Sequence, residues 1–145
     1  MNTKPSTNTM DHEAKKEVVL RNTDEVVTED ELDDILQEDN PTTYIGYETS
    51  GPVHLGHWGG IRKLLDLQKA GFNLKVLFAD LHTYLNKKGS EEWIEDMMDY
   101  WEATFQALGV DAEYVRGRSF QETTEYFHDL VELSLHTTIN RGKRS

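Results

Sequence analysis

The chain has 145 residues, a length that suits one domain with a proper hydrophobic core. Its 27 acidic and 15 basic residues give a net charge of -12, which argues against a general nucleic-acid-binding surface, so any contact with RNA must be local. The absence of cysteine excludes a disulfide framework and a thiolate metal site, and no apolar run is long enough to span a bilayer. We therefore expect a soluble, cytoplasmic protein.

The charge is unevenly distributed along the chain. Residues 24–39 carry many carboxylates and no basic side chain, whereas residues 141–144 are mainly basic. We interpret residues 24–39 as a solvated acidic face. An acidic docking segment and adaptation to high salt are alternatives that the composition leaves open.

The first part of the chain predicts a tail followed by a short helix. Residues 1–17 are charged and poor in apolar side chains, which indicates a mobile tail or a frayed helix. Thr28 followed by Glu31 is a capping-box pattern, and the spacing after it predicts a helix over residues 29–37. The apolar stripe of this helix consists of Leu32, Ile35 and Leu36.

The middle of the chain predicts two strands with a helix between them. Residues 42–48 are rich in β-branched and aromatic side chains, as strands are. Apolar residues recur at helical intervals over residues 54–70, and Gly71 provides a C-terminal stop. The run 74–79 is almost continuously apolar, which predicts a strand covered on both faces, and residues 80–82 would place polar groups at its carboxyl end.

The last third predicts a helix, a strand and a second helix. Ser90 is positioned to cap a helix that runs up to Gly109. Residues 113–117 predict a third strand, residues 118–121 a loop, and residues 123–140 a last helix. The side chains that we expect these two helices to bury are Trp93, Ile94, Met97, Tyr100, Trp101, Phe105 and Leu108 in the first, and Tyr126, Phe127, Leu130, Val131, Leu133 and Leu135 in the second.

Strands and helices alternate along the chain, which is typical of βαβ units. We therefore predict an α/β protein with a parallel, doubly wound sheet. In such sheets ligands bind beyond the carboxyl ends of the strands. Residues 47–57, 80–84 and 120–121 follow the three predicted strands, so we expect them to converge on one crevice.

The clearest candidate site is the turn after the first strand. His54 and His57 are three residues apart at the start of the predicted helix, so they would lie on one helical face and donate hydrogen bonds to the same anion. A helix start also presents unpaired backbone N–H groups. Gly56 leaves room for a flat ring against the backbone. The pattern predicts a nucleotide site; two surface or capping histidines, or a zinc site that adds His82, are alternatives.

The sequence around this turn also resembles a known family. Residues 44–57 (Tyr-Ile-Gly-Tyr-Glu-Thr-Ser-Gly-Pro-Val-His-Leu-Gly-His) contain the HIGH signature of the first synthetase class, and residues 66–72, 79–86 and 120–121 match further pieces in the right order. From about residue 21 to residue 145, the chain resembles the N-terminal half of a tyrosyl-tRNA synthetase of the archaeal or eukaryotic type.

The resemblance implies a Rossmann-like, HUP-type catalytic domain. It would be partial over residues 21–145 and preceded by a tail over residues 1–20 that is mobile or partly helical. Family members continue into a KMSKS-type loop and an anticodon-recognition domain, so we expect this chain to be a fragment that does not complete the reaction alone. Thr49 is a smaller departure, because the family usually has proline there.

The resemblance also implies roles for individual residues. Tyr44 would hydrogen-bond the phenol of a bound tyrosine, and His54 and His57 would be the catalytic residues that stabilise the triphosphate of ATP. No metal ligand is implied. The full tyrosine pocket would consist of Tyr44, Gly46, Glu48, Leu77, Ala79, His82, Phe120 and Gln121, and the ATP site of Gly51, His54, Gly56 and His57.

The implied reaction is attack by the tyrosine carboxylate on the α-phosphorus of ATP, followed by transfer of the tyrosyl group to tRNA-Tyr. The implied partners are tyrosine, ATP with its accompanying Mg²⁺, and tRNA-Tyr, with no tightly bound cofactor. Family members form homodimers, which we do not expect of this piece. Two alternatives stay open: another H-x-G-H adenylyl-transferring enzyme, such as a tryptophanyl synthetase or a nucleotidylyltransferase, and a truncated binding domain without catalysis.

Overall fold

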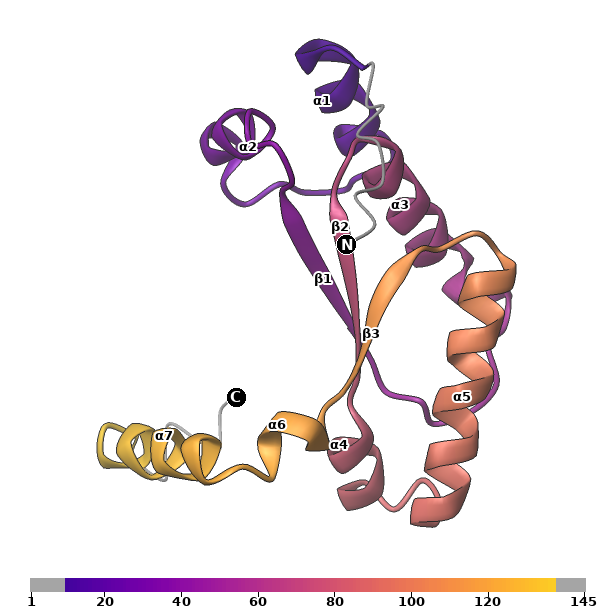
Figure 1. Ribbon diagram of the computed structural model, residues 1–145, viewed down its shortest axis with the longest axis vertical. Coiled ribbons are helices and arrows are strands. Elements are labelled where there is room, and N and C mark those ends of the chain that lie inside the picture. The colour runs from indigo at the N-terminus through magenta and orange to yellow at the C-terminus, as the bar shows by residue number, and fades with distance from the viewer. Residues whose placement is uncertain (1–9, 138–145) are drawn as a thin grey trace, which may run out of the picture.

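The fold is an α/β arrangement of three parallel strands and several helices, described by a computed structural model over residues 10–137 (Figure 1). The elements follow the predicted alternation, with short helices added at the carboxyl ends of the second and third strands. In chain order they are α1 (His12–Leu20), α2 (Glu29–Ile35), β1 (Thr42–Tyr47), the 3₁₀ turn η1 (Leu55–His57), α3 (Trp58–Lys69), β2 (Asn73–Phe78), α4 (Asp80–Leu85), α5 (Glu91–Ala107), β3 (Ala112–Arg116), α6 (Arg118–Gln121) and α7 (Thr124–Leu135).

The sheet has the order β1-β2-β3, and both neighbouring pairs are parallel. Because parallel crossovers are right-handed and both of these run in the same direction across the sheet, α3 and α5 must lie on the same face. Figure 1 shows them on one side of the strands. The predicted parallel α/β fold is therefore confirmed. Both of its βαβ units place their helix on the same face of the sheet.

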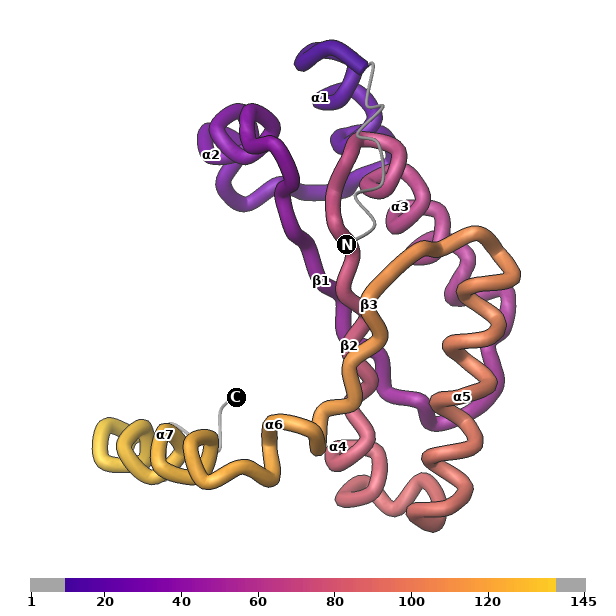
Figure 2. Tube along the Cα trace, in the orientation of Figure 1, coloured from indigo at the N-terminus to yellow at the C-terminus, as the bar shows by residue number. Residues whose placement is uncertain are grey.

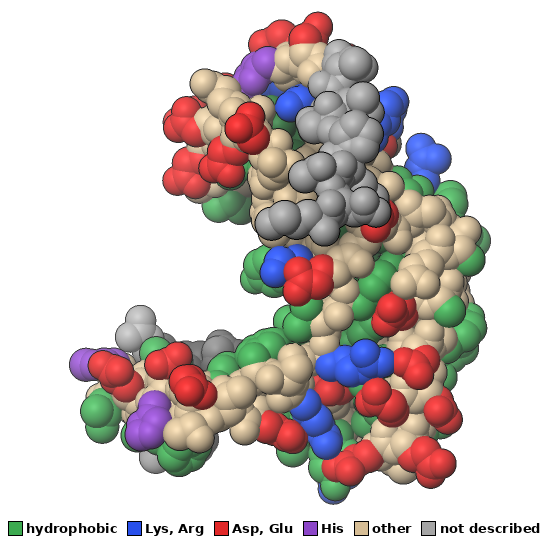
Figure 3. Space-filling model, in the orientation of Figure 1, with side chains coloured by type: hydrophobic (Ala, Val, Ile, Leu, Met, Phe, Trp, Pro, Cys, Tyr) green, Lys and Arg blue, Asp and Glu red, His purple; other side chains and the backbone are tan. Residues whose placement is uncertain are grey.

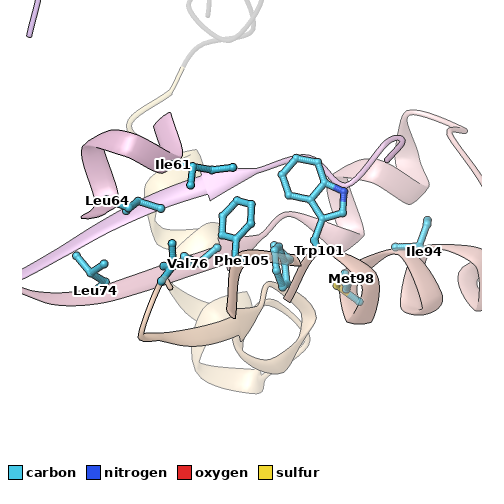
Figure 4. Close-up of a cluster of buried hydrophobic side chains, with 10 residues drawn as sticks. Ile61, Leu64, Leu74, Val76, Ile94, Met98, Trp101 and Phe105 are labelled. Atoms are coloured by element: carbon cyan, nitrogen blue, oxygen red, sulfur yellow. The ribbon is translucent and has the colours of Figure 1, made fainter. Parts of the chain in front are cut away.

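The hydrophobic core lies between the sheet and these two helices (Figure 4). Val76 and Phe78 of β2 are fully buried, and Trp101 and Phe105 of α5 pack against them from the opposite layer. Burying aromatic side chains of this size contributes most of the stability of a small core. The buried cluster consists of Ile61, Leu64, Leu74, Val76, Phe78, Ile94, Met98, Trp101, Phe105 and Val110.

The other face of the sheet, called the open face below, carries a mixture of exposed and half-buried side chains. The prediction that β2 is covered on both faces is wrong, because Lys75 is exposed while its neighbours Leu74 and Val76 are buried. Alternation places successive side chains on opposite faces, so paired residues share a face. The open face consists of Tyr44, Gly46, Lys75, Leu77, Glu113 and Val115.

The open face forms the floor of a hollow that Figure 3 shows between the N-terminal helices and α7. On this open face Lys75 of β2 forms an ion pair with Glu113 of β3, with 2.9 Å between Nζ and Oε2. Both side chains keep about half of their surface in contact with solvent, so the pair contributes little to stability. The exposed fraction of Tyr44 is 74%.

The described part of the N-terminal segment contains the helix α1. Asp11 caps α1 by accepting a hydrogen bond from the Ala14 N–H, and Lys63 of α3 donates to the Val19 carbonyl at 2.9 Å. Thr28 makes no side-chain cap, so the predicted capping box is wrong, although Glu29–Ile35 is helical. Residues 1–9 of the predicted tail lie outside the described residues.

Two short helices occupy positions where the sequence did not indicate them. The predicted loop 118–121 is wrong, because it forms α6, and the polar residues 80–82 begin α4. Both helices start directly at the carboxyl ends of strands, and Asp80 accepts hydrogen bonds at the beginning of each. This long-range contact stabilises turns that local propensity does not favour.

The predicted burial in the last two helices needs correction. Ser90 caps α5 as expected, but Tyr100 and Leu108 are exposed by 44% and 39%, and Met98 is buried in their place. The apolar stripe of α7 is exposed throughout, because this helix projects away from the sheet and has no layer to pack on (Figure 2). Residues 138–140 of the predicted helix and the basic residues 141–144 lie outside the described residues.

The helices of the described chain, including α7, are all too short or too polar to cross a membrane.

Two fully buried threonines provide a matched test of hydrogen bonding in this fold. The hydroxyl of Thr83 donates to the Ala79 carbonyl at 2.8 Å, whereas the hydroxyl of Thr49 has no partner within the described chain. Removing an unpartnered buried hydroxyl relieves a desolvation cost, while removing a bonded one loses its hydrogen bond. We expect Thr49→Val to raise the free energy of unfolding by about 1 kcal/mol and Thr83→Val to lower it by about 1 kcal/mol. Urea titration followed by circular dichroism measures both changes in the free energy of unfolding. Changes of equal sign would contradict the conclusion that only the Thr83 hydroxyl is hydrogen-bonded.

Candidate functional site

The candidate site lies at the carboxyl edge of the sheet, where three segments meet after the three strands. The turn 48–57 follows β1, α4 follows β2, and α6 follows β3. Direct contacts join these segments: Asn86 at the end of α4 donates to Glu48 at 3.0 Å, and the Gly117 N–H ahead of α6 donates to the Phe78 carbonyl at 2.9 Å. The three segments therefore meet at one edge of the sheet, whereas their convergence on one crevice stays a prediction.

The turn after β1 holds the two histidines side by side, with 4.0 Å between their ring centroids. Nδ1 of His54 accepts a hydrogen bond from the Gly56 N–H, and Nδ1 of His57 accepts one from the His54 N–H, both at 3.1 Å. In a neutral imidazole only one nitrogen carries a proton, so an accepting Nδ1 places that proton on Nε2. Each ring therefore keeps an Nε2–H donor that the described chain does not use.

His54 caps a 3₁₀ turn, and the α-helix proper begins only at Trp58. The prediction of one continuous helix from residue 54 is thus wrong at its first turn, although the histidines do lie where helical structure starts. Gly56 sits directly under the His54 ring: a Cβ there would lie 2.8 Å from Cε1 of that ring. Any larger residue would displace the imidazole and break its bond to the backbone.

His57 also contacts the hydrophobic core. Its ring lies edge-on to Trp101, with 4.7 Å between the centroids, and 6.3 Å from the ring of Tyr47. Burial lowers the pKa of the His57 imidazole below its ordinary value, and the neighbouring charge of His54 adds to this effect. At neutral pH the ring is therefore uncharged and donates from Nε2.

We expect an NMR titration to place the pKa of His57 below 6.5, and His54→Gln to move it back toward that value without reaching it. Because the pKa of His57 is lower in the folded chain, the unfolded chain binds the proton more readily. Protonation of His57 therefore lowers the free energy of unfolding as the pH falls below about 6.5. His57→Gln should remove this part of the acid dependence. A His57 pKa above 6.5 in the native protein would contradict the burial argument.

Trp101 contributes to the candidate site, which the sequence pattern did not predict. Its indole N–H donates to the Gly51 carbonyl at 2.8 Å and so holds the turn that carries the histidines. Helical spacing identifies Trp101 as a core residue, which it is, since its exposed fraction is 1%. No signal in the sequence connects it with a carbonyl fifty residues earlier.

The predicted tyrosine-pocket residues divide between the open face and the carboxyl edge. Tyr44, Gly46 and Leu77 share the open face, and Gly46 pairs directly with Leu77. A Cβ at Gly46 would meet nothing within 4 Å, so a flat group has room to lie over this position. Ala79 lies between β2 and α4, and His82 is exposed on α4.

The last two predicted pocket residues lie on α6. Phe120 is exposed by 38%, and its ring is 5.8 Å edge-on from that of Tyr126. Gln121 is half-buried, and its buried Oε1 has no hydrogen-bond partner within residues 10–137. Gln121 therefore holds an unused acceptor that is buried beside Gly117, at the carboxyl end of β3.

Tyr44 and the histidine pair lie on different sides of β1. Tyr47, which contacts His57, belongs to the helix-covered face, whereas Tyr44 belongs to the open face by strand alternation. A ligand that touches both must extend across the carboxyl edge of the sheet.

The zinc arrangement is not formed. Within residues 10–137, no group of three or more His, Cys, Asp or Glu side chains is gathered closely enough to hold a metal ion. His54 and His57 are adjacent, but His82 is an exposed residue of α4 without a contact to them.

Three parallel strands joined by helical crossovers define an α/β protein with a wound parallel sheet. Comparison with known proteins narrows the class: over residues 36–143 the chain matches the family described as tRNA synthetases class I (W and Y), and it belongs to that family. The Rossmann-like fold expected from the resemblance is thereby confirmed.

The relatives are tyrosine–tRNA ligases of archaea. The chain is 45% identical to the enzyme of Methanocaldococcus jannaschii over 89% of its own length and 42% of the relative's, and 44% identical to that of Archaeoglobus fulgidus over 94% and 43%. The chain thus spans less than half the length of the curated relatives it matches.

Solved structures agree with this placement. The A. fulgidus tyrosyl-tRNA synthetase complexed with L-tyrosine superposes with a TM-score of 0.85 at 44% identity, covering 93% of this chain and 44% of that one. The tyrosyl-tRNA synthetase of Aeropyrum pernix gives a TM-score of 0.82 at 30% identity, covering 93% and 43%.

Proposed function

We propose that this chain supplies part of the catalytic domain of a tyrosine–tRNA ligase, with binding sites for tyrosine and the phosphates of ATP. The observation that carries the proposal is the pair of unused Nε2–H donors at the end of β1, next to a sheet face that exposes Tyr44. The likeness to a synthetase solved with L-tyrosine supports the choice of amino acid.

In the proposed reaction the tyrosine carboxylate attacks the α-phosphorus of ATP, forming a new C–O–P linkage and releasing pyrophosphate. The tyrosyl group then passes to the 3′-terminal ribose of tRNA-Tyr, and AMP leaves. Neither the nucleophile nor the leaving group belongs to the protein, so the protein contributes orientation and stabilisation of charge. His54 and His57 would donate their Nε2–H groups to phosphate oxygens, and glycine at position 56 lets the His54 ring lie directly against the η1 backbone.

The amino-acid end would lie across the open face. Tyr44 and Gln121 would supply polar groups for the substrate phenol and its surroundings, and Gly46 would leave room for the ring. Glu48, Leu77, Ala79, His82 and Phe120 complete the proposed pocket. Mg²⁺ enters this proposal only as the ion that accompanies the ATP substrate.

Calorimetry on the 145-residue chain tests the proposal directly. The chain is titrated separately with tyrosine, phenylalanine, tryptophan and ATP. We expect saturable binding of tyrosine and of ATP, and no binding of phenylalanine at the same concentrations, because a site that bonds the phenol leaves polar groups unpaired without it. Preference for tryptophan would favour the tryptophanyl alternative, and binding of neither tyrosine nor ATP would overturn the proposal.

A further inference from the structure

Asp80 lies at the carboxyl edge of the sheet, and the proposed reaction gives it no role. It is the first residue of α4, its exposed fraction is 4%, and its Oδ1 accepts hydrogen bonds from two backbone N–H groups, those of Leu81 and Arg118, each at 2.9 Å. The second bond spans 38 residues and joins the beginning of α4 to the beginning of α6. A buried carboxylate used in this way connects two segments that carry proposed pocket residues.

The helix that Asp80 connects to has other attachments besides this bond. The Gly117 N–H ahead of it donates to the Phe78 carbonyl, and the Arg118 guanidinium lies 5.2 Å from the centroid of the Tyr84 ring. α6 contains only Arg118–Gln121, and none of these residues is buried. On one side a cavity of about 310 Å³ borders both Asp80 and the Arg118 side chain, so packing does not hold the helix there. The Arg118 guanidinium pairs with Glu91 at 3.1 Å, but Glu91 is largely exposed, and such a pair is weak.

The turn ahead of α6 is built tightly around the Asp80 carboxylate. A Cβ at Gly117 would lie 2.9 Å from Asp80 Oδ1, 2.8 Å from Gln121 Oε1 and 3.2 Å from the Phe78 carbonyl oxygen. Only glycine lets the chain pass this closely to both side chains. The position of Gln121 therefore depends on the same contact that Asp80 makes with the backbone.

We propose that Asp80 is a positioning residue for the amino-acid pocket: its hydrogen bond to the Arg118 N–H fixes α6, and with it Phe120 and Gln121, relative to Ala79, which precedes α4, and His82, which lies on α4. This inference rests on the proposed function. Within this proposal the acceptor oxygen carries the positioning, because both bonds run from backbone N–H groups to Oδ1 and an amide oxygen can accept the same bonds.

The test compares Asp80→Ala, which removes the acceptor, with Asp80→Asn, whose amide oxygen can accept the same two bonds. Glu91→Ala is the matched control, because it removes the ion pair to the Arg118 side chain and leaves the Arg118 N–H bond untouched. Two quantities are measured on each variant: hydrogen exchange of the backbone amides of residues 117–122, and tyrosine affinity by calorimetry.

We expect Asp80→Ala to speed exchange in residues 117–122 and to weaken tyrosine binding, each by about tenfold or more, which is a loss of about 1.4 kcal/mol or more. Asp80→Asn and Glu91→Ala should stay within about twofold of the unsubstituted chain in both measurements. Asp80→Asn matching the unsubstituted chain supports the proposal even if Asp80→Ala fails to fold.

Loss of tyrosine affinity in Asp80→Asn would overturn the proposal in favour of a direct role of the charge, and unchanged exchange and affinity in Asp80→Ala would overturn it altogether. Failure of the proposed function looks different, because the unsubstituted chain would then bind no tyrosine. In that case exchange in residues 117–122 still decides whether Asp80 fixes α6.

Discussion

Trp101→Ala is expected to lower the free energy of unfolding by about 3 to 5 kcal/mol, the range for truncating a large buried aromatic side chain. Trp101 is fully buried, packs on Tyr47 and Phe105 at ring distances of 5.2 and 5.6 Å, and bonds the Gly51 carbonyl. A loss of this size is a large part of the total stability of a small domain. Urea denaturation followed by circular dichroism measures it.

Two companion variants separate the parts of this effect. Trp101→Phe keeps a ring in the core and loses the bond to Gly51, so we expect a smaller loss of about 1 to 3 kcal/mol, the cost of leaving a buried carbonyl unpaired. Trp58 is the control, because it lies on α3 with 43% of its surface exposed, and Trp58→Ala should cost less than about 1 kcal/mol. Equal losses for Trp58 and Trp101 would contradict the assignment of the core.

The second large effect is expected at the histidine pair. His54→Ala and His57→Ala should each weaken ATP binding by about 10- to 100-fold, because a hydrogen bond to a charged group contributes about 1.5 to 3 kcal/mol. In each case the lost group is an Nε2–H donor that the backbone holds in one tautomer. Calorimetric titration with ATP provides the measurement.

His128→Ala serves as the control for this experiment, since His128 lies on α7, away from the carboxyl edge. Its ATP affinity should equal that of the unsubstituted chain. If both His54→Ala and His57→Ala also bind ATP as tightly as the unsubstituted chain, the phosphates lie elsewhere and the proposed site is wrong. Tyrosine affinity, measured in parallel, shows whether each variant keeps the rest of the edge intact.

Several features that depend on neighbouring residues in the sequence were predictable, although the capping box at Thr28 was not among them. The Ser90 cap, the stop at Gly71 and the strand–turn–helix order around His54 and His57 all follow from contacts within a few residues. For example, Gly71 has a φ of 98°, a conformation that glycine adopts without strain. The resemblance to the synthetase family rests on the same local segments, and the family assignment confirmed it.

Features that depend on distant partners were not predictable. The apolar stripe of α7 has the spacing of a buried helix, yet Leu130 and Leu133 are exposed by 53% and 62%. The run of β2 is apolar enough for burial on both faces, yet only one face is covered, because both crossovers lie on the same side. Periodicity states that a face is apolar, but it does not state what packs on it.

The sequence by itself determined the succession of strands and helices, the histidine pair at a helix start and the family to which the chain belongs. Only the tertiary structure decided that Trp101 holds the Gly51 carbonyl and that Asp80 ties α6 to α4. The physical reason is the range of the interactions. Caps, stops and periodicity act within a few residues, whereas these hydrogen bonds to Trp101 and Asp80 join groups 50 and 38 residues apart that meet only when the sheet has formed.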